Sequence, residues 1–219
     1  MENKKWDYVW AAGCSHTVEE FKPGLRSWAS RIAKKLNIPC RNYSVGGGSN
    51  MRVCRLLEEQ FILNKPNGNP LILIGCTEFH RCELFMVQQW LSFTVSSSVM
   101  PRNSIESTVH RYLKAIYGNP EFTQILALHN IFMLKGLTDY LSSNGYDYLL
   151  VPMFDYQKHK KIANSIFDDF NEFDQAYMPF CRTGPYVSID EGFHYGNNAH
   201  EAWAEVVWEK VKKKFNVEI

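Results

Sequence analysis

Short apolar runs alternate along this chain with segments whose apolar residues recur at helical spacing. Runs rich in aromatic and β-branched residues predict strands near residues 6–12, 40–45, 71–75 and 147–153. The run Leu71-Ile72-Leu73-Ile74 is apolar without alternation, as expected for a central strand buried on both faces of a parallel sheet.

Apolar residues recur at helical spacing between the predicted strands. This spacing predicts helices over residues 25–36, 51–63 and 121–143. The apolar face of the last of these includes Phe122, Ile125, Leu128, Phe132 and Leu137. A final helix is expected to be capped by Asn198, with Glu201 completing a capping box. Alternation of strands and helices predicts a three-layer α/β/α sandwich with a mostly parallel sheet.

One stretch interrupts the alternation. Residues 79–120 are apolar and aromatic without clean periodicity, and Ser96-Ser97-Ser98 breaks them. We expect a single domain over 1–219, with this insertion forming a lid beside the site or a contact between subunits of a homo-oligomer. Further on, an acidic cluster at Asp168, Asp169 and Glu172 is expected to be a solvated face.

The charge, the apolar runs and the cysteines of the chain bear on which ligands and which cell compartment are expected. The net charge of +1 gives no overall attraction to nucleic acid or membranes. No signal peptide or membrane-length apolar run is visible. The six cysteines form no C-x-x-C pair, so neither a metal site nor another cofactor is expected. The thiols are predicted to be free and the protein cytoplasmic.

Glycine and small polar residues follow three of the predicted strands. These stretches are Gly13-Cys14-Ser15, Gly46-Gly47-Gly48-Ser49-Asn50 and Gly75-Cys76-Thr77-Glu78. Ligands bind at the carboxyl ends of parallel strands, so Ser15 can be a nucleophile there; the alternative is a turn serine that caps a helix. The glycine loop either brings backbone N–H groups to a ligand or makes a tight turn.

In order and spacing, these stretches resemble the conserved blocks of the SGNH, or GDSL-like, hydrolase family. Block one of the family corresponds to Gly13-Cys14-Ser15, and block two to Asn42, Ser44 and Gly47. Block three corresponds to Gly75-Cys76-Thr77, and the last block to Glu191-Gly192-Phe193-His194, preceded by Asp190. The chain also resembles short SGNH-like proteins encoded by tailed phages, which would place it in the host cytoplasm.

The resemblance implies a flavodoxin-like SGNH hydrolase fold and a serine hydrolase. Ser15 would be the nucleophile, His194 the base, and Glu191 or Asp190 the residue that orients the base. Gly47 and Thr77 would contribute to the oxyanion hole. Asn50 would line the pocket or, as we favour, cap the second helix. The implied substrate is an ester or acetyl group on a small molecule or carbohydrate.

Some residues depart from the family pattern. Cys14 replaces an aspartate, and Thr77 replaces the asparagine whose side chain lies in the oxyanion hole. Because losing one such donor typically costs 10²–10³ in rate, two alternatives remain open. One is a catalytically weak protein that binds a ligand, and the other is a structural phage protein that makes contacts through 79–120. His16, beside Ser15, is an alternative base.

Overall fold

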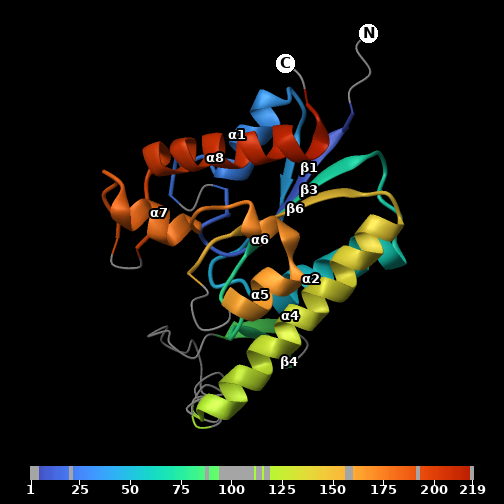
Figure 1. Ribbon diagram of the computed structural model, residues 1–219, viewed down its shortest axis with the longest axis vertical. Helices are drawn as coiled ribbons and strands as arrows, with labels where there is room; N and C mark the ends of the chain where they lie inside the picture. The colour runs from blue at the N-terminus through green and yellow to red at the C-terminus, as the bar shows by residue number, and fades with distance from the viewer. Residues whose placement is uncertain are drawn as a thin grey trace.

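The computed structural model describes residues 5–19, 22–86, 89–93, 111, 115, 119–155, 160–190 and 193–217. A parallel sheet of four strands lies at its centre, in the order β2, β1, β3, β6 (Figure 1). The strands are β1 (Tyr8–Ala12), β2 (Cys40–Asn42), β3 (Pro70–Cys76) and β6 (Asp147–Pro152). The strands and the parallel sheet predicted from the apolar runs are confirmed.

Helices cover both faces of this sheet. One face carries α1 (Trp28–Lys35) and α8 (Asn197–Phe215). The other carries α2 (Asn50–Leu57), its π-helical continuation η1 (Glu58–Leu63) and α4 (Pro120–Ser143). Because side chains alternate along a strand, Val9 and Ala11 enter the first core, whereas Trp10 and Ala12 enter the second. The molecule is therefore a three-layer α/β/α sandwich, as predicted.

The chain between β6 and α8 passes around one edge of the sheet. It forms α5 (Lys160–Ile166), α6 (Asp168–Asn171) and α7 (Tyr177–Thr183). Phe167 and Phe170 join the core on the α4 side, whereas Phe173 and Tyr177 join the core on the α8 side. Since β6 is the last strand in the sheet order, this segment covers the edge that β6 would otherwise expose.

Asp169 is buried, which corrects the expectation of a solvated acidic face. Its Oδ2 accepts a hydrogen bond from the backbone N–H of Leu150 (2.8 Å), and its Oδ1 accepts one from Lys214 Nζ (2.5 Å). The carboxylate thus satisfies an N–H group of the edge strand that no further strand can pair. Asp168 and Glu172 are exposed, as expected.

The buried face of α4 is also different from the predicted one. Phe122, Ile125 and Phe132, assigned to the apolar face, are 38%, 62% and 62% exposed. The residues that α4 buries are Leu126, Ala127, Asn130, Ile131, Leu134, Thr138 and Leu141. Apolar residues lie on more than one side of this helix, so spacing alone did not identify the side that packs on the sheet.

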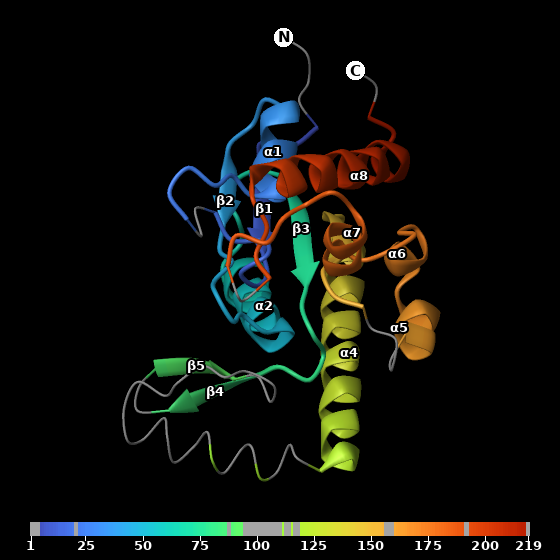
Figure 2. The same ribbon diagram turned by 90° about the vertical axis from the view of Figure 1, so that its left-hand side faces the viewer.

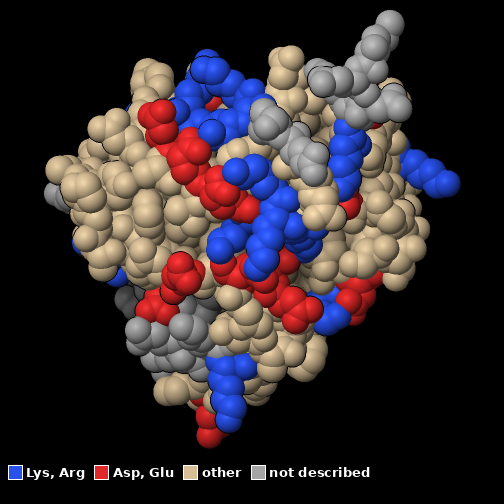
Figure 3. Space-filling view, turned by 45° about the horizontal axis from the view of Figure 1, so that its top comes forward, with Lys and Arg blue, Asp and Glu red and all other residues tan. Residues whose placement is uncertain are grey.

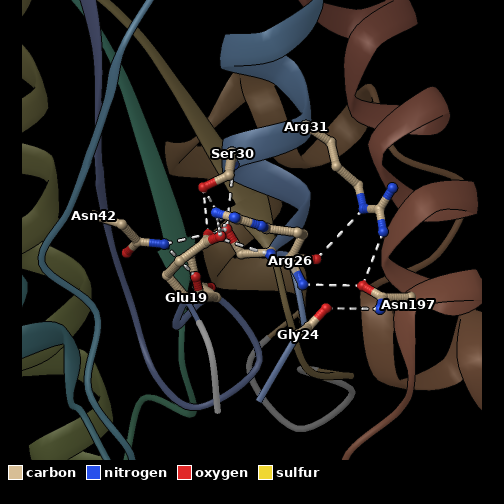
Figure 4. Close-up of polar contacts among 9 residues, drawn as sticks. Glu19, Gly24, Arg26, Ser30, Arg31, Asn42 and Asn197 are labelled. Carbon is tan, nitrogen blue, oxygen red and sulfur yellow. Dashed lines mark hydrogen bonds and ion pairs between the residues drawn. The ribbon is translucent and has the colours of Figure 1, made fainter. Parts of the chain in front are cut away.

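Helix α8 begins two residues earlier than predicted. Its N-cap is Gly196, not Asn198, so the capping box with Glu201 does not form. Asn197 instead joins this end of the helix to the loop before α1 (Figure 4). Its Oδ1 accepts hydrogen bonds from Arg26 N and Arg31 Nη2, each at 2.9 Å, and its Nδ2 donates to the carbonyl of Gly24 at 3.0 Å.

An antiparallel hairpin lies within the predicted insertion. Its strands are β4 (Cys82–Met86) and β5 (Gln89–Phe93), and it projects away from the central sheet (Figure 2). Glu83 of β4 anchors it to α2 by accepting hydrogen bonds from Arg55 Nε (2.9 Å) and Nη2 (3.1 Å). Most of the remaining insertion, and with it the expected lid or subunit contact, lies outside the described residues.

Acidic and basic side chains lie next to one another on the face that Figure 3 shows. The ion pairs of α8 have the same mixed character, with Lys213 paired to Glu172 (2.6 Å) and Lys35 to Glu205 (2.9 Å). This mixing agrees with the small net charge of the chain. Across the part of the chain that the structure describes, no helix has the length and apolar character needed to span a membrane.

Candidate active site

The loops that follow β1, β2 and β3 converge at one edge of the sheet, because β1 pairs with both of its neighbours. Val45 N donates to the carbonyl of Gly13 at 3.4 Å. Gly48 packs so closely on the same carbonyl that a Cβ there would lie 2.5 Å from the oxygen. The close approach requires glycine, and it brings the glycine-rich loop against the start of the Ser15 turn.

Ser15 lies in a tight turn directly after β1. Thr17 N and Val18 N both donate to the carbonyl of Cys14, at 2.9 and 3.1 Å. The Thr17 side chain fills the space above Gly13 and Gly75, where a Cβ would lie 2.7 and 2.2 Å from Thr17 Oγ1. The residues on both sides of Ser15 are buried, whereas Ser15 itself is half-buried. The turn therefore leaves Ser15 partly exposed, while the residues around it are tightly packed.

A polar network holds the chain that leaves this turn (Figure 4). Glu19 accepts hydrogen bonds from Ser27 Oγ at 2.7 Å and from Ser30 Oγ. Asn42, at the end of β2, donates from Nδ2 to the carbonyl of Thr17 at 2.7 Å and to Ser27 Oγ at 3.2 Å. The turn is thereby fastened to β2 and to the start of α1.

Cys14, immediately before Ser15, is a packing residue. Its side chain is fully buried, and burial raises the pKa of the thiol, so the thiol is neutral. All six cysteines are free. A thiolate nucleophile at this turn is therefore disfavoured relative to the neighbouring hydroxyl.

His194 is paired with an acidic side chain. Its Nδ1 lies 2.9 and 2.8 Å from the two carboxylate oxygens of Asp190, and its backbone N–H donates to Asp190 Oδ1 at 3.1 Å. A carboxylate can only accept, so Nδ1 carries the proton and Nε2 is the acceptor. The loop is further closed by a hydrogen bond from Ile189 N to the carbonyl of His194 (2.7 Å). Glu191, the other acidic candidate, lies outside the described residues.

His16 connects the His194 loop to the Ser15 turn. Its ring lies against that of His194, with centroids 5.1 Å apart and 35° between the ring planes. The rings of Phe154 and Tyr177 pack against it at 5.3 and 5.5 Å. Burial, together with the electrostatic effects of His194 and Arg81 nearby, holds the pKa of His16 well below its ordinary value. His16 is therefore a neutral ring beside the site, a setting that does not favour it as the base.

The glycine-rich loop offers backbone groups to the same region. Gly47 has a φ of +71°, a left-handed conformation that favours glycine, and it is exposed. The N–H of Gly48, by contrast, is engaged with the carbonyl of Val45 at 3.1 Å. Of these two residues, Gly47 is the better placed to offer an N–H group to a ligand.

Asn50 does not cap α2, which is the role that was favoured for it. The N-cap of α2 is Ser49, whose side chain accepts from Arg52 N, and Asn50 is the first residue of the helix. The Asn50 side chain is buried and bonds both backbone groups of Thr77, accepting from the N–H at 2.9 Å and donating to the carbonyl at 3.0 Å. It therefore fixes the loop after β3, while the Thr77 hydroxyl donates to the carbonyl of Glu78 at 3.5 Å.

Arg81 is a further charged residue at this edge of the sheet, and the sequence analysis did not select it. Its Nε and Nη2 each lie 2.9 Å from Glu78 Oε2, and its Nη1 lies 3.5 Å from the carbonyl oxygen of Gly48. The guanidinium lies over the ring of Phe154, 4.9 Å from its centroid. The only sequence signal was a charged residue soon after the end of a buried strand.

The described residues contain no group of three or more His, Cys, Asp or Glu side chains arranged to hold a metal ion. The polar groups gathered here are instead a hydroxyl, an imidazole paired with a carboxylate, and glycine N–H groups. This set of groups suits proton transfer and nucleophilic attack.

Neither a protein-family model nor a curated protein matches the chain, but solved structures do. The psychrotrophic esterase EstA from Pseudoalteromonas sp., in a structure inhibited by monoethylphosphonate, is 12% identical with a TM-score of 0.55, covering 96% of this chain and 100% of that one. A candidate acylhydrolase from Bacteroides fragilis is 10% identical with a TM-score of 0.51, covering 98% and 89%. The chain therefore shares the α/β fold of these two structures, and this agrees with the fold class expected from the sequence.

Proposed function

We propose that the chain is a serine hydrolase that cleaves an ester or acetyl group from a small molecule or a carbohydrate. Ser15 is the nucleophile, His194 the general base and Asp190 the residue that orients the base. The observation that carries the proposal is the Asp190–His194 pair, on a loop whose imidazole lies against His16, the residue after Ser15. The fold shared with a bacterial esterase supports the same reaction class.

The proton moves between two side chains in this reaction. Nε2 of His194 takes the proton of Ser15 as Oγ forms a bond to the substrate carbonyl carbon. Asp190 stabilises the resulting imidazolium through Nδ1. When the tetrahedral intermediate collapses, the bond to the leaving oxygen breaks and His194 returns its proton to that oxygen. Water then attacks the acyl-serine with His194 again as base, which releases the acid and restores Ser15.

Backbone N–H groups stabilise the negative charge that develops on the substrate oxygen. The N–H groups of Ser15 and Gly47 are the candidates for this role. Thr77 is a poor donor, because its side chain is fully buried and its N–H is committed to Asn50.

The same position of Thr77 favours a second candidate function, a protein of this fold that binds a ligand with little turnover. In that case the Ser15 site would hold a small molecule or carbohydrate, and hydrolysis would be weak or absent. The two functions differ in whether Ser15 forms a covalent bond to the acyl group of the substrate.

Hydrolysis of p-nitrophenyl acetate, compared among the wild type, Ser15→Ala, His194→Ala and the double variant, tests the proposal. Each single variant is expected to lose nearly all activity, and the double variant little more, because the residues act as one unit. His129→Ala, at an exposed position on α4, is the control and should retain full activity.

Covalent labelling supplies a second measurement. A fluorophosphonate should add to Ser15 in the wild type, with the site identified by peptide mass spectrometry, and should not label Ser15→Ala. Unchanged hydrolysis in both single variants would contradict the proposal. Absence of both hydrolysis and labelling in folded wild-type protein would favour the binding function.

A further inference from the structure

The guanidinium of Arg81 contacts loops from three strands of the sheet. Arg81 itself follows β3, the carbonyl oxygen of Gly48 follows β2, and the ring of Phe154 follows β6. All three loops lie at the carboxyl edge of the sheet, where ligands bind in parallel α/β folds. The side chain is 12% exposed, so it is largely enclosed but still reachable at this edge.

The neighbours of Arg81 place it beside the Ser15 turn. Gly48, which faces Nη1, packs on the carbonyl of Gly13. Phe154, which lies under the guanidinium, packs on the ring of His16 at 5.3 Å. Gly13 and His16 flank Ser15 in the chain on either side. The positive charge also contributes, after burial and His194, to the low pKa of His16.

The guanidinium is held in one orientation. Glu78 Oε2 accepts a hydrogen bond from Nε at 2.9 Å and forms an ion pair with Nη2, also at 2.9 Å. This leaves Nη1 on the side of Gly48, where its 3.5 Å contact with the carbonyl is at the long limit of a hydrogen bond. Such a contact is easily exchanged for a stronger one to a negatively charged oxygen. Glu78 binds the opposite edge of the guanidinium, so the positive end of the pair faces Gly48.

Thr77 leaves the oxyanion hole without a side-chain hydrogen-bond donor. The family that the chain resembles has an asparagine there that donates from its side chain, whereas Thr77 is fully buried and its N–H donates to Asn50. Arg81 is four residues further along the same loop and carries a fixed positive charge.

We propose that Arg81 is a catalytic residue whose Nη1 stabilises the oxyanion of the tetrahedral intermediate, replacing the side-chain donor that Thr77 does not supply. The inference rests on the proposed hydrolase function of Ser15. A preoriented donor of this kind acts on the charge that develops in the transition state and not on the neutral ester, so it affects kcat more than KM.

The test measures kcat and KM for p-nitrophenyl acetate in Arg81→Met, Arg81→Lys and the wild type. Arg81→Met is expected to lower kcat by about 10²–10³ with KM changed less than about threefold. Arg81→Lys, which keeps the charge, should recover about a tenth of the wild-type kcat or more. The rate of fluorophosphonate addition to Ser15, which also builds negative charge on oxygen, should fall with kcat in Arg81→Met.

Arg41→Met is the matched control, because Arg41 also lies over an aromatic ring, that of Tyr8 at 4.0 Å, but belongs to β2. It should keep kcat and KM close to the wild type. If Arg81→Met does not fold, as judged by circular dichroism and thermal unfolding, Arg81→Lys and Arg81→Gln carry the test, with a loss of kcat expected in Arg81→Gln.

The outcomes separate this inference from the proposed function. Ser15-dependent hydrolysis that is unchanged in folded Arg81→Met overturns the role of Arg81 alone. A rise in KM with kcat unchanged also overturns it, because Arg81 would then bind substrate without favouring the transition state. Hydrolysis that does not depend on Ser15, or no hydrolysis and no labelling in the wild type, overturns both.

Discussion

The rings of His16 and His194 lie against each other, with their centroids 5.1 Å apart. His16 follows Ser15 directly, whereas His194 lies on the loop before the last helix, so this contact joins the two ends of the candidate site. Asp190 holds His194 at its edge through Nδ1, and His16 holds it at its face. The His194 ring is contacted from two directions, so it has little freedom to turn away from the Ser15 turn.

Replacing His16 should therefore affect hydrolysis through the placement of His194. His16→Ala removes the ring and is expected to lower kcat about 10- to 100-fold, because small displacements of a base are costly. His16→Phe keeps an aromatic face and should retain kcat within about threefold. Steady-state kinetics with p-nitrophenyl acetate measures both, with thermal unfolding as the check on folding. Equal losses in the two variants would show that the imidazole, and not the ring face, is required.

Asp190→Asn should impair the base directly. An amide can present its N–H₂ group to Nδ1 and so favour the wrong tautomer, and it cannot stabilise the imidazolium. We expect kcat to fall by about 10²–10⁴, measured on the same ester. Glu191→Gln is the matched control at the other acidic candidate and should stay within about threefold of the wild type. A larger loss of kcat in Glu191→Gln than in Asp190→Asn would assign the orienting role to Glu191.

The sequence predicted the sheet well because buried parallel strands leave a local signal. Leu71 to Ile74 is apolar at every position, since both faces of β3 are covered. The location of Ser15 after a strand and of His194 before the last helix was also predictable, because glycine after a strand and an acidic residue near a histidine before a helix are short-range patterns; their catalytic roles stay a prediction. The contact between Asp190 and His194 Nδ1 could be seen only from the loop geometry.

What could not be predicted depends on partners distant in the chain. Asn50 looks like a helix cap locally, but its amide bonds Thr77, 27 residues away. Asp169 looks like a solvated acid, but it satisfies an N–H group of the edge strand. Arg81 belongs to no short motif, and its position beside the Ser15 turn arises only when the loops meet.

The anchor of the β4–β5 hairpin gives a prediction about stability. The Glu83 side chain is 3% exposed and lies 2.9 Å from Arg55 Nε and 4.0 Å from Arg52 Nε. Glu83→Gln removes a buried carboxylate that faces two guanidinium groups and should lower the free energy of unfolding by about 3 kcal/mol. Urea denaturation measures the change.

Glu59→Gln provides the matched control for this pair. Glu59 also contacts Arg55 at 2.9 Å, but its side chain is 45% exposed. Solvent screens such a pair, so the expected loss is about 0–1 kcal/mol. Similar losses in the two variants would mean that burial of Glu83 adds nothing to the anchor.

His200 makes stability depend on pH. Its ring is buried in α8 with Nε2 3.4 Å from the Tyr177 hydroxyl, and Nδ1 has no hydrogen-bond partner among the described residues. Burial lowers the pKa of His200 to about 4. In the unfolded chain the pKa of a histidine is about 6.5. Between these two values the unfolded state binds a proton that the folded state does not, so stability falls as pH drops from about 6.5 to about 4 and this loss ends below that range.

The expected slope from His200 is at most about 1.4 kcal/mol per pH unit, and buried His16 contributes with the same sign. Urea denaturation at several pH values should show a smaller acid loss in His200→Gln than in the wild type, even if its stability at pH 8 is lower. His129→Gln, at an exposed position, should leave the pH dependence unchanged. A pH dependence that is the same in His200→Gln and the wild type would mean that the ring at position 200 is protonated equally in the folded and unfolded states.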